Sequence, residues 1–196
     1  ADAGSQIEKT RVLEVKRANR GWELKTRNVT AKADYCIVAN GARNSLRNVG
    51  TEYTASDTMF ALGYYVPSNQ DHIDIQFLPK LEGYIWVFPR CGHLSVGICG
   101  KGESAQSLRA RLERYMVEKD ISWKHGSFYG HVLPSLESAG WRRNRVAGDG
   151  WLAVGDAGGL VDPITGEGLY YAMRSRCLAV RVGLDGTSCQ RDKAAP

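Results

Sequence analysis

Glycines and acidic residues gather in one stretch near the carboxyl end of the chain, where they could bind a flat or anionic ligand. The sequence from 151 to 168 is WLAVGDAGGLVDPITGEG, and its first four residues predict a buried strand. That strand would carry Asp156 to its carboxyl end, where open α/β sheets bind their ligands. Because they lack side chains, Gly155, Gly158 and Gly159 would let such a ligand approach the backbone closely.

A second pair of glycines stands where a long helix is expected, over about residues 165–183. Gly166 and Gly168 would leave the first amide groups of that helix free to face a ligand, and such a terminus favours negative charge. The pair Asp162–Pro163 precedes them. Alternatively, the glycines only permit tight turns and Asp156 only caps. Each glycine in or near a helix costs roughly 0.5–1 kcal/mol relative to alanine, so several of them in one short stretch are costly unless they serve a function. We therefore favour a ligand site.

An aromatic row forms the second chemically informative stretch. In the sequence GYIWVFPR, strand alternation places Tyr84, Trp86 and Phe88 on one face and aliphatic residues on the other. The strand expected at 94–100 carries small residues, among them Gly97, on one of its faces. Large rings beside small residues could enclose an elongated apolar slot. Ordinary packing of large against small side chains is the alternative.

Short strands separated by turn residues should hold the aromatic row in an antiparallel sheet. A helix capped by Ser104 would cover this sheet with one apolar stripe, formed by Leu108, Leu112, Tyr115 and Met116. The expected strands are 7–16, 22–27, 34–39, 59–66, 72–78, 84–88, 94–100 and 127–133, with a helical turn at 43–48 and a crossing segment at 140–148.

Composition narrows the classes of function. The chain has 196 residues, 43% of them apolar, and no apolar run of the roughly 20 residues that span a bilayer. Its net charge is +5, but the basic residues alternate with acidic ones, so nucleic-acid binding is not favoured. Five cysteines without CxxC spacing and four scattered histidines predict neither a disulfide framework nor a metal site. We expect a cytoplasmic protein, with peripheral membrane contact left open.

The glycine-rich stretch resembles a motif of the geranylgeranyl reductase family of FAD-dependent oxidoreductases, which have the glutathione-reductase type of fold. The resemblance rests on residues 155–173, GDAGGLVDPITGEGLYYAM, and also on the strand that ends before Asn40 and Gly41. It implies that Asp156 hydrogen-bonds the ribityl chain of FAD and that 166–169 face the pyrimidine end of its ring. The cofactor-binding residues implied are Gly155, Asp156, Gly159, Asp162, Pro163, Gly166, Gly168 and Leu169.

The aromatic row resembles the Tyr-x-Trp-x-Phe-Pro motif that lines the isoprenoid cavity in the same family and is followed by Gly-x-Gly. Cys99 replaces the second glycine of that pattern, with Gly100 one place further on. No Gly-x-Gly-x-x-Gly turn precedes residue 7, so we expect a fragment without the N-terminal dinucleotide-binding motif that retains FAD weakly. The substrate-binding residues implied are Tyr84, Trp86, Phe88, Pro89 and Gly97.

We therefore expect an α/β protein of mixed α and β elements, with a partial FAD/NAD(P)-binding domain and an inserted antiparallel-sheet substrate domain. The first would comprise residues 1–56 and 148–183, the second 57–147, and 184–196 would be a tail. The expected activity is reduction of isoprenoid carbon–carbon double bonds in lipid biosynthesis, with FAD as cofactor, a prenyl lipid as substrate and NAD(P)H or ferredoxin as electron donor. No catalytic residue is identified, and the fragment is expected to be inactive alone.

Two other functions stay open. An aromatic monooxygenase of the p-hydroxybenzoate hydroxylase type would share the glycine-rich region, and a flavin halogenase of that branch would show a Trp-x-Trp-x-Ile-Pro pattern, which residues 84–89 do not. A truncated flavoprotein that folds without turning over is the alternative from another class.

Overall fold

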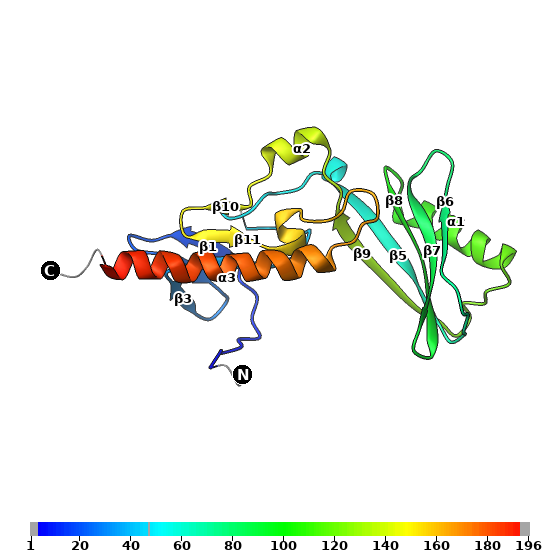
Figure 1. Cartoon of the computed structure of the whole chain (residues 1–196), viewed down its shortest axis with the longest axis horizontal. Coiled ribbons are helices and arrows are strands. Elements are labelled where there is room, and N and C mark those ends of the chain that lie inside the picture. The colour runs from blue at the N-terminus through cyan, green and yellow to red at the C-terminus, as the bar shows by residue number, and fades with distance from the viewer. Residues whose placement is uncertain (1–3, 47, 193–196) are drawn as a thin grey trace. The chain divides into compact units, whose positions relative to one another are not determined.

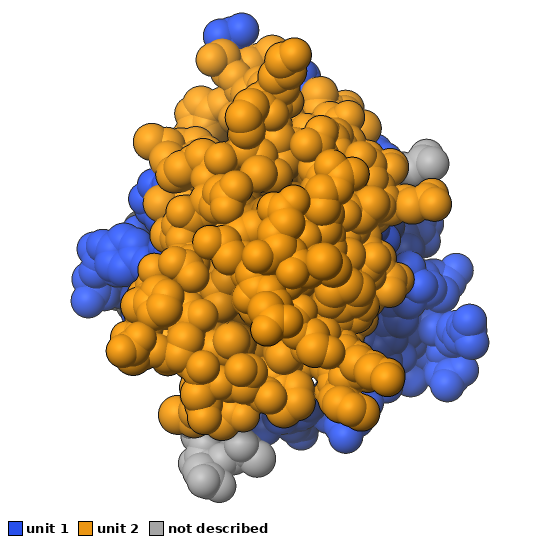
Figure 2. Space-filling model, turned by 90° about the vertical axis from the view of Figure 1, so that its right-hand side faces the viewer, with its two compact units in different colours: residues 1–52, 142–162, 167–196 blue, residues 53–141, 163–166 orange. Residues whose placement is uncertain are grey.

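The computed structural model describes residues 4–46 and 48–192 and separates the chain into two units, coloured in Figure 2. Unit 1 consists of residues 1–52, 142–162 and 167–196, and unit 2 of residues 53–141 and 163–166. The units change at 52/53 and 141/142, where the sequence suggested 56/57 and 147/148. The short segment 163–166 groups with unit 2, although its neighbours on both sides belong to unit 1.

Unit 1 contains two small sheets and a long helix (Figure 1). The first sheet is an antiparallel meander, and the second joins two parallel strands to one antiparallel edge strand. The elements, in sheet order, are β1 (Glu14–Arg17), β2 (Trp22–Lys25) and β3 (Thr30–Ala33), then β10 (Ala147–Gly148), β11 (Trp151–Ala153) and β4 (Cys36–Val38), with the 3-10 helix η2 (Gly155–Gly158) and α3 (Leu169–Asp192).

In the amino-terminal region one expectation is wrong and one strand was not predicted. The strand expected at 7–16 begins only at Glu14, and β3 was not foreseen. Ile7 and most of its neighbours up to Leu13 are exposed, so a longer strand would bury little apolar surface. Instead, β2 turns back at 26–29 to pair with the polar strand β3, which the apolar pattern could not reveal.

The helical turn expected at 43–48 is also absent from its described residues. The side chain of Asn44 is buried, accepts a hydrogen bond from the Leu46 amide at 3.0 Å and donates one to the Val49 carbonyl at 2.6 Å. Such side-chain bonds give the backbone an alternative to helical pairing. The segment therefore folds as a loop around one asparagine.

The helix expected at 165–183 begins later and ends later than predicted. Gly166 has φ +71°, a left-handed conformation that a right-handed helix excludes, so α3 starts at Leu169. It continues to Asp192, which makes residues 184–192 helical where a tail was expected. Once begun, a helix propagates through local backbone bonds and tolerates single glycines at about 1 kcal/mol each. The rest of the expected tail, 193–196, lies outside the described residues.

Unit 2 is a five-stranded antiparallel sheet in the order β6-β7-β8-β5-β9. The strands expected at 59–66, 94–100 and 127–133 are confirmed to within one or two residues, and the aromatic strand is longer than expected. The expected crossing segment contains the end of α2 and β10. The elements are η1 (Ala55–Asp57), β5 (Thr58–Val66), β6 (Asp74–Phe77), β7 (Glu82–Arg90), β8 (His93–Lys101), α1 (Ala105–Glu118), β9 (Ser127–Pro134) and α2 (Ser138–Arg143), the last crossing from unit 2 into unit 1.

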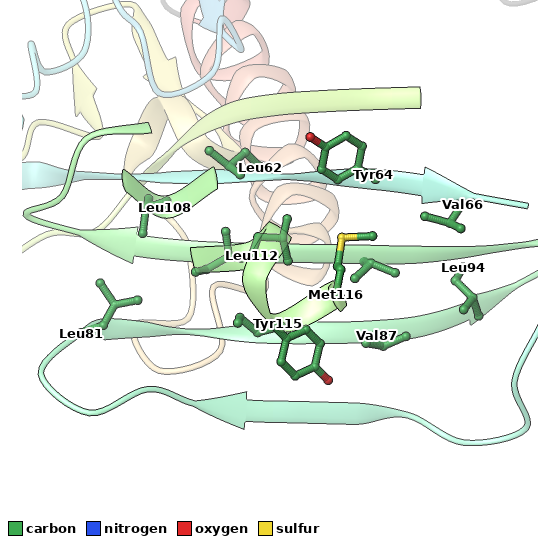
Figure 3. Packing of buried hydrophobic residues seen from close by; sticks show 13 residues of the cluster. Leu62, Tyr64, Val66, Leu81, Val87, Leu94, Leu108, Leu112, Tyr115 and Met116 are labelled. Atoms are coloured by element: carbon green, nitrogen blue, oxygen red, sulfur yellow. The ribbon is translucent and has the colours of Figure 1, made fainter. Parts of the chain in front are cut away.

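Helix α1 closes one face of this sheet. Ser104 caps it as predicted, because its hydroxyl oxygen accepts a hydrogen bond from the Ser107 amide at 3.1 Å. The predicted stripe is confirmed: Figure 3 shows Leu108, Leu112, Tyr115 and Met116 against the sheet. Burying each such side chain stabilises the fold by roughly 1.5–3 kcal/mol. Across the described residues, no helix is long and apolar enough to cross a membrane.

A buried carboxylate fixes the return from β9 into α2. Asp57 is 2% exposed and accepts two hydrogen bonds from Thr54, from the amide at 3.0 Å and from the hydroxyl at 2.7 Å. A Cβ atom on Gly140 would lie 2.0 Å from Asp57 Oδ1. Glycine at 140 therefore lets α2 approach this carboxylate.

We predict that Gly140→Ala destabilises the protein by about 1–3 kcal/mol, the usual cost of overpacking. Urea unfolding would measure the change. Gly130→Ala is the matched control, because its added Cβ would meet no atom closer than 3.8 Å. Equal stability of the two variants would contradict the proposed role of Gly140.

Candidate functional site

Two segments that the sequence marked separately meet at one edge of a sheet in unit 1. Strand β4 runs parallel to β11, with Val38 opposite Ala153, and the Val154 amide donates a hydrogen bond to the Val38 carbonyl at 3.0 Å. The residues that follow both strands therefore emerge at the same carboxyl edge, which is where parallel sheets bind ligands. These residues include Asn40 and Asp156.

The turn after β11 is held against helix α3. Gly155, with φ +55°, donates a backbone hydrogen bond to the Ser175 hydroxyl at 3.0 Å. A Cβ atom on Gly155 would lie 3.1 Å from the Cβ of Ala172. The space that the sequence assigned to a ligand is thus occupied by the helix. Gly159, with φ +67°, ends η2 in the left-handed conformation that glycine adopts easily.

The carboxylate of Asp156 is the candidate ligand contact at this edge. It is half-buried, and burial raises the pKa of Asp156 above the usual range of aspartate. A Cβ atom on Gly168 would lie 3.1 Å from its Oδ1 atom, so glycine at 168 lets this oxygen lie close to the start of α3. Within residues 4–46 and 48–192, no hydrogen-bond donor is paired with this carboxylate. The arrangement suits a ligand that brings a hydroxyl group.

Only some of the first amide groups of α3 lack a hydrogen-bond acceptor within the described part of the chain. Glu167 accepts a hydrogen bond from the Tyr170 amide at 2.9 Å, so the chain's own carboxylate occupies one of the amide groups expected to face a ligand. The amides of Leu169 and Tyr171 have no acceptor in the described part of the chain. Ahead of the helix, the Asp162 amide donates to the Glu167 carbonyl at 2.8 Å and closes the loop that contains Pro163 and Gly166.

The aromatic row lies on the face of the unit 2 sheet opposite α1. Ring centroids are 5.8 Å apart for Tyr84 and Trp86, and 6.1 Å apart for Trp86 and Phe88. The alternating residues Ile85 and Val87 are buried in the core under α1, as the alternation predicted.

Pro89 and Gly97 were also expected to contact the substrate, but neither is exposed on the aromatic face in the way that was predicted. Pro89 follows Phe88 and pairs with Leu94, a residue of the core on the α1 side, so it lies on the opposite face from the aromatic rings. At Gly97, an added Cβ atom would lie 2.2 Å from the Trp86 ring. The indole thus fills the space above Gly97. At this position the large and small side chains pack against each other and do not enclose a slot.

Cys99 stands where the resembling motif has its second glycine. It pairs with Tyr84 and with Ala61, is buried, and burial raises the pKa of the Cys99 thiol. The neighbouring Gly100 cannot replace that glycine, because its missing side chain points toward Leu108 of α1, 2.6 Å from an added Cβ. The side chain of Cys99 therefore occupies space on the aromatic face that the glycine of the motif would leave open.

One end of the aromatic row meets a segment assigned to the cofactor. The Tyr84 hydroxyl donates a hydrogen bond to the carbonyl of Thr165. Gly166, in the same segment, approaches Leu133 of β9, with 3.9 Å from an added Cβ to the nearest methyl group. Unit 2 thus brings the segment 163–166 to the end of the aromatic row, across 81 positions of sequence.

Sequence reasoning missed three polar residues near these sites. Ser175 lies one turn after Ala172 on α3, so helical spacing could have found it. Ser95 and Tyr129 share the aromatic face with Trp86 and form a hydrogen-bonded group with its indole. Strand alternation in β8 and β9 was the signal available for these two.

Comparisons with known proteins agree with this architecture. A scan against protein-family models finds no match. The digeranylgeranylglycerophospholipid reductase 2 of Methanothermobacter thermautotrophicus is 29% identical, over 79% of this chain and 42% of its own length. The menaquinone reductase of Mycolicibacterium smegmatis is 27% identical, over 82% of this chain and 43% of its own length. The chain thus spans less than half the length of these relatives.

A solved structure supports the fold class. A geranylgeranyl bacteriochlorophyll reductase-like protein from Thermoplasma acidophilum superposes with a TM-score of 0.78 at 24% identity, covering 93% of this chain and 50% of that one. The mixed α/β architecture with antiparallel sheets matches a partial FAD-binding fold of geranylgeranyl reductase-like proteins. Together with the similarity to relatives named as digeranylgeranylglycerophospholipid reductases, this fold confirms the predicted resemblance to geranylgeranyl reductases.

The raised pKa of Asp156 predicts a pH-dependent gain for Asp156→Asn. A carboxyl whose pKa is higher in the folded than in the unfolded chain stabilises the fold at low pH, and this contribution is lost as the pH rises through its folded value. Asparagine is neutral throughout, so the variant should unfold at a higher temperature than the parent at pH 7 and at a similar temperature near pH 3. Asp120→Asn, an exposed site with φ +54° that asparagine tolerates, is the control and should show no such trend.

Proposed function

We propose that this chain forms part of an FAD-dependent oxidoreductase that reduces carbon–carbon double bonds of isoprenoid chains. The observation that carries the proposal is the hydrogen bond from Tyr84 to the Thr165 carbonyl, which joins the aromatic row to the segment before α3. Relatives named as reductases of prenylated lipids and quinones support the same class of activity. NAD(P)H or ferredoxin is the proposed electron donor.

The residues of unit 1 fit a flavin. An accessible, half-buried carboxylate at Asp156 is suited to a ribityl hydroxyl, and unpaired amides at Leu169 and Tyr171 are suited to a ring edge with partial negative charge. When bound, FAD would supply the hydride. Gly155 and Gly159 would shape the turn rather than contact the cofactor. The proposed contacts within unit 1 are Asp156, Asp162, Gly168 and Leu169.

The aromatic face of unit 2 is the proposed binding surface for the prenyl chain. Ile75 pairs with Trp86 and Phe77 pairs with Tyr84, so the edge strand β6 extends the aromatic row. Ile75 is 53% exposed and Phe77 is 68% exposed. An apolar chain that covers these side chains gains about 25 cal/mol for each Å² removed from water. Together with Phe88, this face would hold the chain by hydrophobic contact and keep water from the double bond.

A flavin-binding titration tests the role of Asp156. Asp156→Asn keeps an acceptor oxygen but turns a hydrogen bond to a charged group into a neutral one, so it should weaken FAD binding by about five- to tenfold, because the two kinds of bond contribute roughly 1.5–3 and 0.5–1.5 kcal/mol. Quenching of flavin fluorescence would measure the affinity, with Asp120→Asn as the matched control. Unchanged affinity in Asp156→Asn would remove the proposed cofactor contact.

An activity assay separates the proposed reaction from its rivals. With reduced FAD and a geranylgeranyl substrate, the full-length protein that contains this chain should yield a product heavier by two hydrogen atoms per reduced double bond, measured by mass spectrometry. Oxygen consumption that depends on a phenol would favour an aromatic monooxygenase instead. A protein that binds FAD and changes neither substrate would favour the non-catalytic alternative.

A further inference from the structure

One level of the unit 2 sheet alternates rings and glycines across four strands. Trp86 of β7 pairs with Gly97 of β8, Gly97 pairs with Gly63 of β5, and Gly63 pairs with Tyr129 of β9. A Cβ atom on Gly97 would lie 2.2 Å from the Trp86 ring, and one on Gly63 would lie 2.7 Å from the Tyr129 hydroxyl. The two aromatic side chains therefore extend toward each other above the paired glycines.

The two rings are joined through Ser95, two residues before Gly97 on the same face. The Trp86 indole N–H donates a hydrogen bond to Ser95 Oγ at 3.3 Å, and Ser95 Oγ lies 3.0 Å from the Tyr129 hydroxyl oxygen. Ser95 is 6% exposed. Tyr65 stacks on Tyr129 with ring centroids 4.5 Å apart, which helps to hold the phenol ring in place.

The group formed by Trp86, Ser95 and Tyr129 contains one hydroxyl proton that has no acceptor within the group. The indole N–H is only a donor, and each hydroxyl carries one proton. Ser95 and Tyr129 share a single hydrogen bond, so one of their two protons takes part in it and the other remains. No side chain or carbonyl in the described part of the chain accepts that second proton.

The remaining proton persists at neutral pH and belongs to a neutral group. Burial is the main cause that raises the pKa of Tyr129 above the usual range of tyrosine, against smaller lowering contributions from Ser95, Trp86 and Arg90. Ser95 is buried and Tyr129 is half-buried, so the remaining proton is available to a partner that reaches this face. An uncharged oxygen is the partner of lowest cost here, because bringing an anion beside the buried Ser95 would require stripping its water shell.

We propose that the Ser95–Tyr129 pair is a binding site for a neutral oxygen atom of a prenyl ligand, such as a quinone carbonyl or an ether oxygen. The inference rests on the proposed function, because it takes the aromatic face as the surface that binds the prenyl chain. The apolar side chains of Trp86, Phe88 and Ile75 would contact the chain, and the hydroxyl pair would fix its oxygenated end on the sheet.

Two pairs of probes test this site by comparing each oxygenated ligand with its oxygen-free analogue. The first pair is 2-geranyl-1,4-naphthoquinone and 2-geranylnaphthalene, and the second is a geranyl alkyl ether and the hydrocarbon with CH₂ in place of oxygen. Affinities for the whole chain, measured by calorimetric titration, give an oxygen preference for each pair. The pair that shows the preference identifies a quinone or an ether as the source of the oxygen.

The double variant Ser95→Ala, Tyr129→Phe should reduce the oxygen preference about three- to tenfold and leave the affinity for the hydrocarbon within about twofold. Each single variant retains one hydroxyl and should lose less. Tyr65→Phe removes a hydroxyl from the same face and should change nothing. Phe88→Leu should weaken both members of a pair equally, because it removes ring surface and leaves the hydrogen-bonded group of Trp86, Ser95 and Tyr129 intact.

Three results would overturn the inference. The parent chain could show no oxygen preference with either pair, the double variant could keep its preference, or the double variant could lose both ligands equally, which would mean that the hydroxyls only orient Trp86. If the folded parent chain binds none of the four probes, the proposed function fails and this site fails with it. Thermal unfolding of each variant verifies that the fold is retained.

Discussion

The parallel pairing of β4 with β11 is the constraint on which the candidate cofactor site depends. The two strands have three residues each, and more than one hundred residues separate them in the sequence. Cys36, Val38, Trp151 and Ala153 are buried, and this shared core holds the strands in register. Because parallel strands end at the same edge, the pairing determines where Asp156 emerges. The turn that follows is then fixed from the other side by its contacts with α3.

In unit 2 the two faces of the sheet differ in burial and composition. The face under α1 contains the larger core, and the opposite face has a smaller buried cluster of Met59, Ala61 and Cys99. That opposite face retains large apolar side chains at intermediate or high exposure, from Trp86 to the edge residues Ile75 and Phe77. Antiparallel sheets commonly leave one face to water, and such faces are then polar. An aromatic face in that position is characteristic of a binding surface.

The glycines of this chain indicate positions where another group lies close to the backbone, but not whether that group belongs to the protein or to a ligand. Gly97 accommodates the indole of Trp86, and Gly155 accommodates Ala172 of α3. Gly168 accommodates the carboxylate of Asp156, which has no hydrogen-bond partner among the described residues. All three were expected to contact a ligand. Of these, Gly168 is the one whose surroundings fit a ligand, because the neighbouring group is polar and unpaired.

The sequence alone determined the elements whose signals are local. Strand alternation placed Tyr84, Trp86 and Phe88 on one face, helical spacing placed Leu108 and Leu112 in the core, and Ser104 marked a helix start, because each pattern repeats within a few residues. Only the tertiary structure decided which residues meet across strands. A slip of two residues in β8 would keep every side chain on its face and yet separate Ser95 from Tyr129. The capping of Tyr170 by Glu167 and the loop around Asn44 likewise depend on side-chain geometry that no periodicity encodes.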